Sequence, residues 1–178
     1  SACDPVDAVF TPAAHGIPLT SALLQEMDYT ITESGTYYLA EHFSVRDIRI
    51  SGADVVLCRH GFDCTLVNDG GFLEVRDCTY EEDADGNMVG SPWSAEITNE
   101  GGGLVIQSGR VNPLNINGDG HVTINGGNVY QVRSGGQGQF MGPITSRIEI
   151  NGGTVRGILR SSDSLRIRGG RVSGIQNT

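Results

Sequence analysis

A short pattern of alternating aliphatic residues and a glycine-containing bend returns four times in the second half of the sequence. It reads GLVIQSGRVNPL at 103–114, HVTINGGNVYQV at 121–132, RIEINGGTVRGI at 147–158 and SLRIRGGRVSGI at 164–175. Each copy has two apolar positions two residues apart, then a bend, then two further apolar positions. Recurrence of this kind is typical of stacked repeats, in which each unit buries its apolar side against the next.

The aligned apolar positions define the expected core. They are Leu104/Ile106, Val122/Ile124, Ile148/Ile150 and Leu165/Ile167, then Val111, Val129, Val155 and Val172, then Leu114, Val132, Ile158 and Ile175, with an earlier copy at Leu73 and Val75. The copies start 31, 18, 26 and 17 residues apart. A variable period suits a coil whose loops differ in length, while glycine at the bend permits left-handed backbone conformations. A glycine-rich β-sandwich is the alternative, but it does not require four copies with the same spacing.

The expected fold is therefore all-β: a single-stranded, right-handed parallel β-helix with a short N-terminal helical cap. Residues 1–34 form the predicted cap segment and residues 35–178 the predicted β-helix. The cap helix is expected in PLTSALLQEM, residues 18–27, with Thr20 or Ser21 as N-cap and Leu23, Leu24 and Met27 on one side. Because the sequence stops just after the second strand of a coil, we expect it to be a piece of a longer repeat protein.

Charge and composition exclude several functional classes. The net charge of −9 divides into −14 over residues 1–100 and +5 over residues 101–178. An acidic chain of this kind is not expected to bind nucleic acid. The absence of lysine excludes Schiff-base chemistry. No apolar stretch approaches the roughly 18 residues of a membrane span, so membrane insertion is not expected.

Four cysteines, an even number, suit two disulfides in an oxidising compartment. The preferred pairs are Cys58–Cys78, which are 20 residues apart and so lie near one coil, and Cys3–Cys64, which would tie the cap to the first coils. Three alternatives remain open. The cysteines could be free core thiols, they could join His60 in a metal site, or one could form a nucleophilic pair with a histidine.

Two further groups of residues are candidate binding sites. Asp83, Asp85 and Asn87 alternate around Gly86 in EEDADGN, which is half of a calcium-binding loop, so calcium is the one cofactor considered. The other reading of this segment is a solvated acidic hairpin loop. The second group is a set of arginines in the last coils, expected to face outward as an anion-binding or glycan-binding patch: Arg147, Arg156, Arg160, Arg166, Arg168 and Arg171. Its other reading is a solvated outer face.

Three segments resemble bacterial extracellular repeat proteins: GTYYLAEHFSV at 35–45, VVLCRHGFDCTL at 55–66 and LEVRDCT at 73–79. Members of that group run G-x-Y-Y-L, then V-x-L-C-L-N-G, then L-x-I-x-D-C, followed by many I-N-G-G-T-V coils. The resemblance covers about residues 35–178 and implies a parallel β-helix in a secreted or cell-surface, adhesin-like protein. The sequence departs from the pattern at Arg59-His60, where Leu-Asn is usual.

These observations together predict a non-catalytic module for adhesion or glycan contact, with an acidic glycan or another surface protein as partner. The alternative is a polysaccharide lyase or hydrolase built on the same fold. Such an enzyme needs acidic residues clustered along one groove. The acids of the regular coils, Asp119, Glu149 and Asp163, do not recur at one coil position, so enzymatic activity is not expected.

Overall fold

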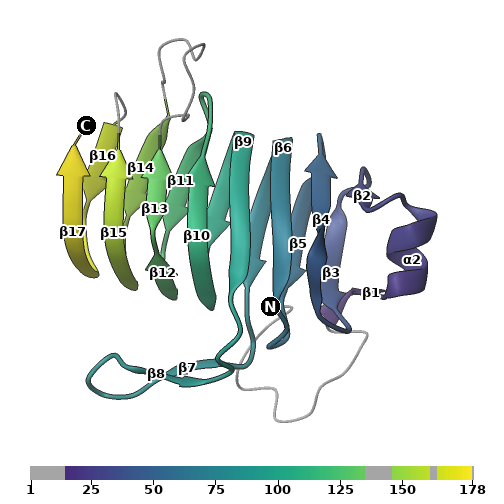
Figure 1. Ribbon diagram of the computed structural model, residues 1–178, viewed down its shortest axis with the longest axis horizontal. Coiled ribbons are helices and arrows are strands. Elements are labelled where there is room, and N and C mark those ends of the chain that lie inside the picture. Colours follow the sequence, from purple (N-terminus) through teal and green to yellow (C-terminus); the bar gives the residue numbers. More distant parts are fainter. Residues whose placement is uncertain (1–14, 135–145, 161–163, 178) are drawn as a thin grey trace.

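The computed structural model describes residues 15–134, 146–160 and 164–177 (Figure 1). This part of the chain is mostly β, with a 15-stranded parallel sheet and a separate antiparallel hairpin. The N-terminal elements are β1 Ile17–Leu19, α2 Ser21–Glu26, β2 Thr30–Ile31, β3 Gly35–Leu39, β4 Phe43–Ser51, β5 Asp54–Cys58, β6 Cys64–Arg76, β7 Tyr80–Glu82, β8 Met88–Gly90 and β9 Ala95–Ile106. The C-terminal elements are β10 Arg110–Ile116, β11 His121–Ile124, β12 Asn128–Tyr130, β13 Val132–Ser134, β14 Arg147–Ile150, β15 Thr154–Arg160, β16 Ser164–Ile167 and β17 Arg171–Asn177. The all-β class and the parallel pairing are confirmed.

The parallel pairings run along the molecule as two ladders, between which successive strands alternate. The first ladder runs through β2, β4, β6, β9 and β10, then through both β12 and β13, and then through β15 and β17. The second ladder runs through β1, β3, β5, β6, β9, β11, β14 and β16. Strands β6 and β9 belong to both ladders. Residues 64–69 of β6 pair with β4, whereas residues 72–76 pair with β5. Figure 1 shows the ladders as two rows of strands, one behind the other.

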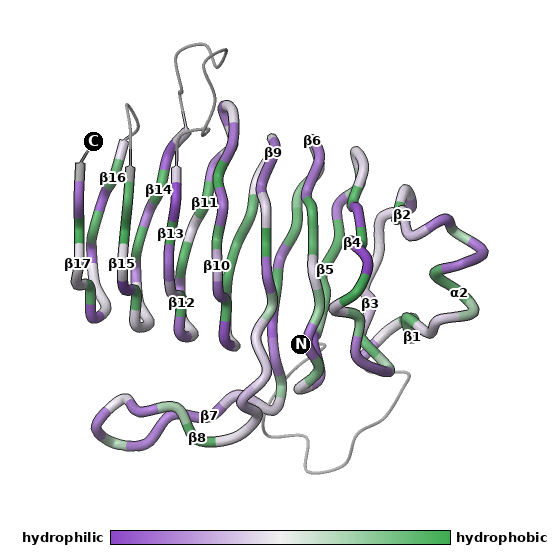
Figure 2. Tube along the Cα trace, viewed as in Figure 1, coloured by the Kyte–Doolittle hydropathy of each residue, from purple (hydrophilic) through white to green (hydrophobic). Residues whose placement is uncertain are grey.

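Strand register places the aligned apolar positions side by side. Leu104 lies beside Val122, and Val122 lies beside Ile148, across β9, β11 and β14. The following side chains are at most 1% exposed: Leu104, Ile106, Val111, Leu114, Val122, Ile124, Val129, Val132, Ile148, Ile150, Val155 and Ile158. Figure 2 shows hydrophobic segments recurring along neighbouring strands. The four aligned residues of β16 and β17 are the exceptions: Ile167 and Ile175 are 45% and 44% exposed, and Leu165 and Val172 are half-buried. The sequence alignment thus predicted the core up to the last described strands.

The corners between the two ladders depend on glycine. Gly127, Gly153 and Gly170 have φ angles of +83°, +78° and +85°, in the left-handed region that favours glycine. A Cβ added at Gly153 would lie 2.7 Å from the carbonyl carbon of Gly126 in the neighbouring corner. The glycine pair recurs because each corner needs both an unusual backbone angle and a close approach to the corner before it.

A ladder of amide side chains follows the same corners. Asn151 Nδ2 donates to Asn125 Oδ1 at 2.9 Å, and Asn125 Nδ2 donates to Gln107 Oε1 at 3.3 Å. Gln107 Nε2 in turn donates to Glu74 Oε1 at 2.7 Å. The ladder continues from copy to copy because register keeps equivalent side chains about one strand spacing, ~4.8 Å, apart.

The N-terminal segment contains the predicted helix and two strands: β2, which lies in the stretch YTIT at 29–32 that the sequence favours as a strand, and β1, which the sequence did not indicate. Helix α2 begins after Thr20, whose hydroxyl accepts a hydrogen bond from Leu23 N at 3.2 Å, and it buries Leu24. On either side of the helix, β1 pairs with β3 and β2 pairs with β4. With three residues, β1 is too short to show a clear alternation in sequence. The described part of this segment therefore extends both ladders and is not only a cover for them.

Candidate functional site

The corner after β5 departs from the repeat and brings metal-binding side chains together. Cys58 ends β5 and is followed by Arg59 and His60, while Cys78 lies at the equivalent corner after β6. His15, which precedes β1, packs against His60 with 5.8 Å between the ring centroids. Three segments that are far apart in the sequence thus meet on one side of the second ladder.

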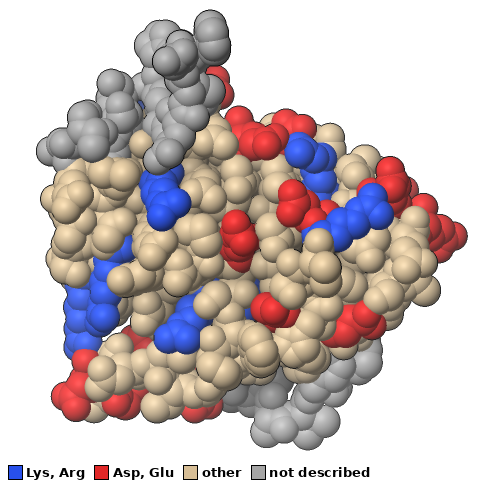
Figure 3. All heavy atoms as spheres, viewed as in Figure 1, with Lys and Arg blue, Asp and Glu red and all other residues tan. Residues whose placement is uncertain are grey.

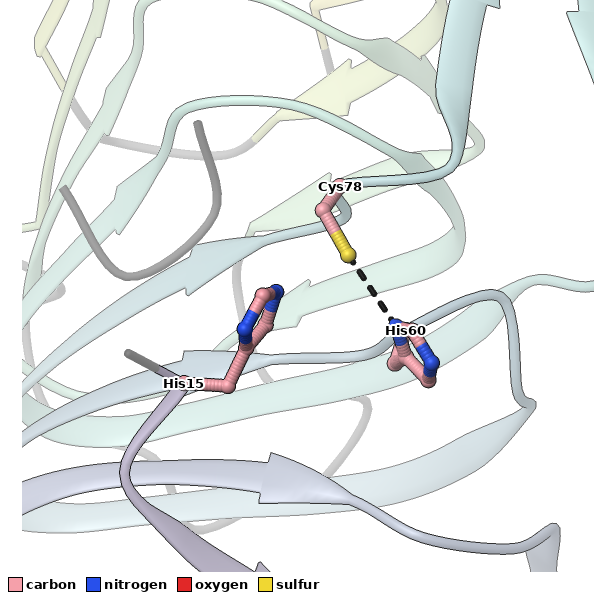
Figure 4. Close-up of side chains that lie close together, drawn as sticks. All are labelled: His15, His60 and Cys78. Atoms are coloured by element: carbon pink, nitrogen blue, oxygen red, sulfur yellow. Dashed lines mark hydrogen bonds between the residues drawn. The ribbon is translucent and has the colours of Figure 1, made fainter. Parts of the chain in front are cut away.

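His15, His60 and Cys78 form the candidate metal centre (Figure 4). One ring nitrogen of each histidine and the Cys78 sulfur all lie within 4.8 Å of one another. His60 Nδ1 lies 3.1 Å from Cys78 Sγ. Figure 4 shows the three side chains converging from separate segments of the chain. Two imidazoles and a thiol in one volume are a ligand set for a transition metal ion.

Apolar and aromatic side chains shield this cluster from water. His15 is 3% exposed, whereas His60 and Cys78 are half-buried. The buried ring of Tyr38 packs edge-on against His15 at 6.0 Å and against His60 at 6.3 Å. Cys58 is fully buried, and its Sγ lies 3.3 Å from Cys78 Sγ. The low dielectric of such a pocket strengthens interactions between ligands and a cation.

Gly16 explains how His15 reaches the cluster. Its φ angle is +92°, and a Cβ at this position would lie 2.1 Å from Thr36 O in β3. Only glycine lets the backbone cross β3 this closely. The next residue, Ile17, then pairs with Tyr37, and the His15 ring is held over the adjacent Tyr38.

A buried ion pair holds the corner that carries His60. Arg59 and Asp77 side chains are 0% and 3% exposed, with Arg59 Nη1 3.6 Å from Asp77 Oδ2. The guanidinium also donates to three carbonyl oxygens: Arg110 O at 2.8 Å, Phe62 O at 3.1 Å and Trp93 O at 2.6 Å. An arginine has the planar array of donors needed to join several segments in this way. Arg59 is therefore a structural centre of this corner.

The Asp77 carboxylate completes the arrangement. Its Oδ1 accepts hydrogen bonds from Gly61 N at 3.0 Å, Thr79 N at 3.0 Å and Thr79 Oγ1 at 2.8 Å. His60 lies between Arg59 and Gly61 and has a φ angle of +50°, which non-glycine residues seldom adopt. Since His60 follows Arg59 and Cys78 follows Asp77, the ion pair positions both candidate ligands.

Burial also sets the protonation states in the cluster. Desolvation, followed by the nearby His15, lowers the pKa of His60, and Asp77 opposes this effect. Burial, followed by the charge of Asp77, raises the pKa of Cys78 to about 11. A nucleophilic cysteine needs a lowered pKa, so that its thiolate form is populated, whereas the pKa of Cys78 is raised. The His60–Cys78 pair is therefore poorly suited to cysteine catalysis, whereas a bound metal cation would itself stabilise the thiolate.

The cysteines differ from the predicted pairing. Cys64 and Cys78 are free thiols, so neither Cys58–Cys78 nor Cys3–Cys64 is formed. Cys58 is disulfide-bonded, but not to another described residue. The 3.3 Å between the sulfurs of Cys58 and Cys78 exceeds the roughly 2.05 Å of a disulfide. Cys64 is 2% exposed within the main core, where burial raises its thiol pKa to about 12. Cys3 lies outside the described residues.

The predicted calcium ligands lie at the tip of the β7–β8 hairpin. Asp83 Oδ1 accepts hydrogen bonds from Asp85 N at 2.9 Å and Asn87 N at 2.8 Å, and Asp83 Oδ2 accepts one from Asn87 Nδ2 at 3.1 Å. The bonds from Asn87 are the main cause of a lowered pKa at Asp83. Arg171 Nη1 donates to Asp85 O at this tip. The Asp83 carboxylate closes a hairpin turn, and calcium binding there stays a prediction.

The predicted arginines do not form one patch, because their strands belong to both ladders. Arg147 and Arg166 line one hollow, Arg156 lines a second, and Arg171 contacts the hairpin. Arg168 Nε lies 3.7 Å from Glu149 Oε1. The side chain of Arg160 is outside the described part of the chain. Figure 3 shows basic side chains over the C-terminal strands, next to the acidic hairpin.

The first hollow has a volume of about 470 Å³ and lies on β11, β14 and β16. Register aligns its outward side chains in two rows across the strands: His121, Arg147 and Ser164 in one, and Thr123, Glu149 and Arg166 in the other. The second hollow, of about 310 Å³, lies on the first ladder and is lined by residues that include Arg110, Tyr130 and Arg156. The arginines thus face two different sides of the molecule.

Sequence reasoning missed three residues of these sites. His15 is separated from His60 by a long stretch of chain, and no spacing motif connects the two. Arg110 was not included because the arginine set was taken from the last coils alone. His121 had a usable signal: it precedes the first apolar position of its copy, as Arg147 does, so alignment alone places both on the outer face.

None of the described helices is long and apolar enough to cross a membrane. Comparison with protein-family models, with curated proteins and with solved structures found no match to this chain.

Proposed function

We propose that this protein is a right-handed parallel β-helix that serves as a non-catalytic, secreted or cell-surface module and binds an acidic glycan over β11, β14 and β16. The helical path of the chain is supported by the alternation of strands between the two ladders. Each time the chain comes back to a ladder, it adds one parallel strand to it. Crossovers between parallel strands are right-handed in nearly all proteins. The described N-terminal segment, with α2, forms the cap of this helix. The location rests on the resemblance to bacterial repeat proteins.

The hollow on β11, β14 and β16 is the observation that carries the binding proposal. Arg147 and Arg166 come from neighbouring strands, and both are exposed. His121, Thr123 and Ser164 add further hydrogen-bonding groups to the same surface. Neighbouring strands are about 4.8 Å apart, so a polymer that crosses them meets a new set of polar side chains at each strand.

An acidic glycan fits this surface better than a neutral one. Guanidinium groups pair with carboxylates or sulfates through two parallel hydrogen bonds. Arg168 is paired with Glu149, so this carboxylate has a counter-charge of its own. The cations that line the hollow are Arg147 and Arg166. Exposed contacts of this kind are individually weak, so binding depends on several of them and on low salt.

The same lining argues against hydrolysis. Among the described residues that surround the hollow, Glu149 is the one carboxylate. Most glycoside hydrolases use two carboxyl groups on opposite sides of the reacting bond. A single carboxylate beside Arg168 supports binding without cleavage.

The test is retention on immobilised polygalacturonate, alginate and hyaluronate, with neutral dextran for comparison. We expect salt-sensitive retention on at least one acidic polymer. It should weaken at least about tenfold in Arg147→Ala/Arg166→Ala, because two contacts of roughly 1 kcal/mol are lost.

The matched control is Arg133→Ala/Arg156→Ala. It removes the same charge from exposed positions on the other ladder and should leave retention unchanged. Equal losses in both double variants would show non-specific charge attraction and contradict the assignment of the hollow. New reducing or unsaturated ends in the bound polymer would identify an enzyme instead.

A further inference from the structure

We propose that His15, His60 and Cys78 bind a zinc ion, in a site separate from the glycan surface. The three residues come from the segment before β1 and from the corners after β5 and β6. The site is at the N-terminal part of the ladders, whereas the glycan surface lies on β11, β14 and β16. Each proposal can therefore fail without affecting the other.

The distances suit zinc. Zinc binds imidazole nitrogen at about 2.0–2.1 Å and thiolate sulfur at about 2.3 Å, which places tetrahedral ligand atoms roughly 3.3–3.8 Å apart. In the structure the three ligand atoms are within 4.8 Å of one another, and His60 Nδ1 to Cys78 Sγ is 3.1 Å. Side-chain shifts of about 1 Å or less bring the three atoms to ideal separations.

The ligand types narrow the choice of metal. Two imidazoles and one thiolate suit a transition metal ion such as zinc, whereas calcium and magnesium need oxygen ligands. Asp77, the nearest carboxylate of the corner, is occupied by Arg59 and by hydrogen bonds from Gly61 and Thr79. Three protein ligands leave a fourth tetrahedral position open, as in zinc sites that keep an exchangeable ligand.

The protein positions these ligands without a metal. Gly16 brings His15 over Tyr38, and the Arg59–Asp77 pair holds the corner on which His60 adopts its left-handed conformation. Strained backbone angles at non-glycine residues concentrate at functional sites, where the surrounding structure maintains them. Pre-ordering of this kind reduces the entropy lost on binding.

Bound zinc would tie the N-terminal segment to two successive corners. His15 precedes β1, a three-residue strand that pairs with β3 at the end of the second ladder. A ligand that binds the folded state stabilises it in proportion to the logarithm of its concentration over Kd. Zinc should therefore raise the thermal midpoint of the protein.

The experiment titrates the full chain with cobalt(II) under anaerobic conditions and without a reductant, so that the Cys58 disulfide stays intact, and then displaces cobalt with zinc. We expect one equivalent of cobalt to bind, with a near-ultraviolet absorption from charge transfer between thiolate and cobalt. Zinc should abolish the absorption. Zinc should also raise the thermal midpoint of the wild-type protein.

Variants assign the ligands. Cys78→Ser should remove the charge-transfer absorption and the zinc-dependent rise in midpoint. His15→Ala and His60→Ala should each weaken binding at least about tenfold, since even residues that only support a ligand contribute that much. His42→Ala is the matched control: His42 pairs with Asp63 outside the cluster, and its loss should leave the affinity unchanged.

Circular dichroism of every variant separates loss of a ligand from loss of the fold. Cys58→Ser is included because Cys58 Sγ lies 3.3 Å from Cys78 Sγ, and this variant should keep the absorption. Loss of the absorption in Cys58→Ser, together with its survival in Cys78→Ser, would overturn the assignment of Cys78. A folded wild-type chain with a free Cys78 thiol that binds no cobalt and gains no thermal stability from zinc would overturn the proposal.

Discussion

The corners at Asn125–Gly127 and Asn151–Gly153 and the corner at Arg59–Gly61 make the same connection between the two ladders in different ways. The first two corners share a short sequence. In each, a glycine pair lies close against the neighbouring corner, and an asparagine side chain hydrogen-bonds to the equivalent amide there. The Arg59 corner instead depends on one buried ion pair and on carbonyl groups from three segments. Repetition builds the regular corners, whereas unique long-range contacts build the corner that holds the candidate metal site.

The two corners should therefore respond differently to substitution. A regular corner contributes backbone fit and exposed hydrogen bonds, each of modest energy. The Arg59 corner contains a buried charge pair, and removing one partner leaves the other without compensation. Three substitutions measure this difference.

Arg59→Leu should have the largest effect. It leaves the Asp77 carboxylate buried without a counter-charge and three carbonyl groups without a donor. We expect the free energy of unfolding to fall by about 3–5 kcal/mol in denaturant titrations. The matched substitution is Arg46→Leu, which breaks an exposed pair with Asp28 and should change stability by no more than about 1 kcal/mol. Equal effects of the two variants would erase the distinction between the corners.

Gly153→Ala should have the next largest effect. At a φ angle of +78°, its new Cβ would lie 2.7 Å from the carbonyl carbon of Gly126. Left-handed strain and the clash together should lower the free energy of unfolding by about 2–4 kcal/mol. Gly52→Ala separates the two causes, because Gly52 has a φ angle of +63° but no atom within 4 Å of a new Cβ. It should lose only the roughly 1–2 kcal/mol of strain. A loss at Gly52 as large as that at Gly153 would show that the close approach contributes nothing.

Asn151→Ala should have the smallest effect. The substitution removes one exposed hydrogen bond, the 2.9 Å contact with Asn125. We expect a loss of about 0.5–1 kcal/mol, measured by the same titration. A loss above about 2 kcal/mol would mean that the amide ladder acts as a cooperative network, and that the regular corners also depend on long-range polar contacts.

The regular part of the fold could be predicted because its information is local and repeated. The alignment of Leu104, Val122 and Ile148 by spacing alone matches the register of β9, β11 and β14. It did not predict β1, since a strand of three residues carries no periodic signal. It also placed the arginines on one surface, although strand alternation cannot show to which ladder a strand belongs.

The candidate metal site could be predicted only in part. His60 and Cys78 were recognised as metal-binding residue types, but the metal-site alternative grouped them with Cys64, which is buried in the main core. His15 was missed because it reaches the cluster through the close approach at Gly16, a tertiary contact. The departure at Arg59-His60 from the expected Leu-Asn pattern was the one local sign of this corner, since a charged residue stands in place of an aliphatic one.

The β7–β8 hairpin links the two regions compared above. Near its base, Ser91 Oγ donates to Gly61 O at 2.7 Å, and Trp93 O accepts from Arg59 at 2.6 Å. At its tip, Asp85 O accepts from Arg171, which is 86 residues away in the sequence. In a stack of repeats each unit contacts only its neighbours, so the ends can unfold independently of one another. A brace from the first corners to β17 couples distant units, and the protein should unfold more cooperatively than its repeats alone would allow.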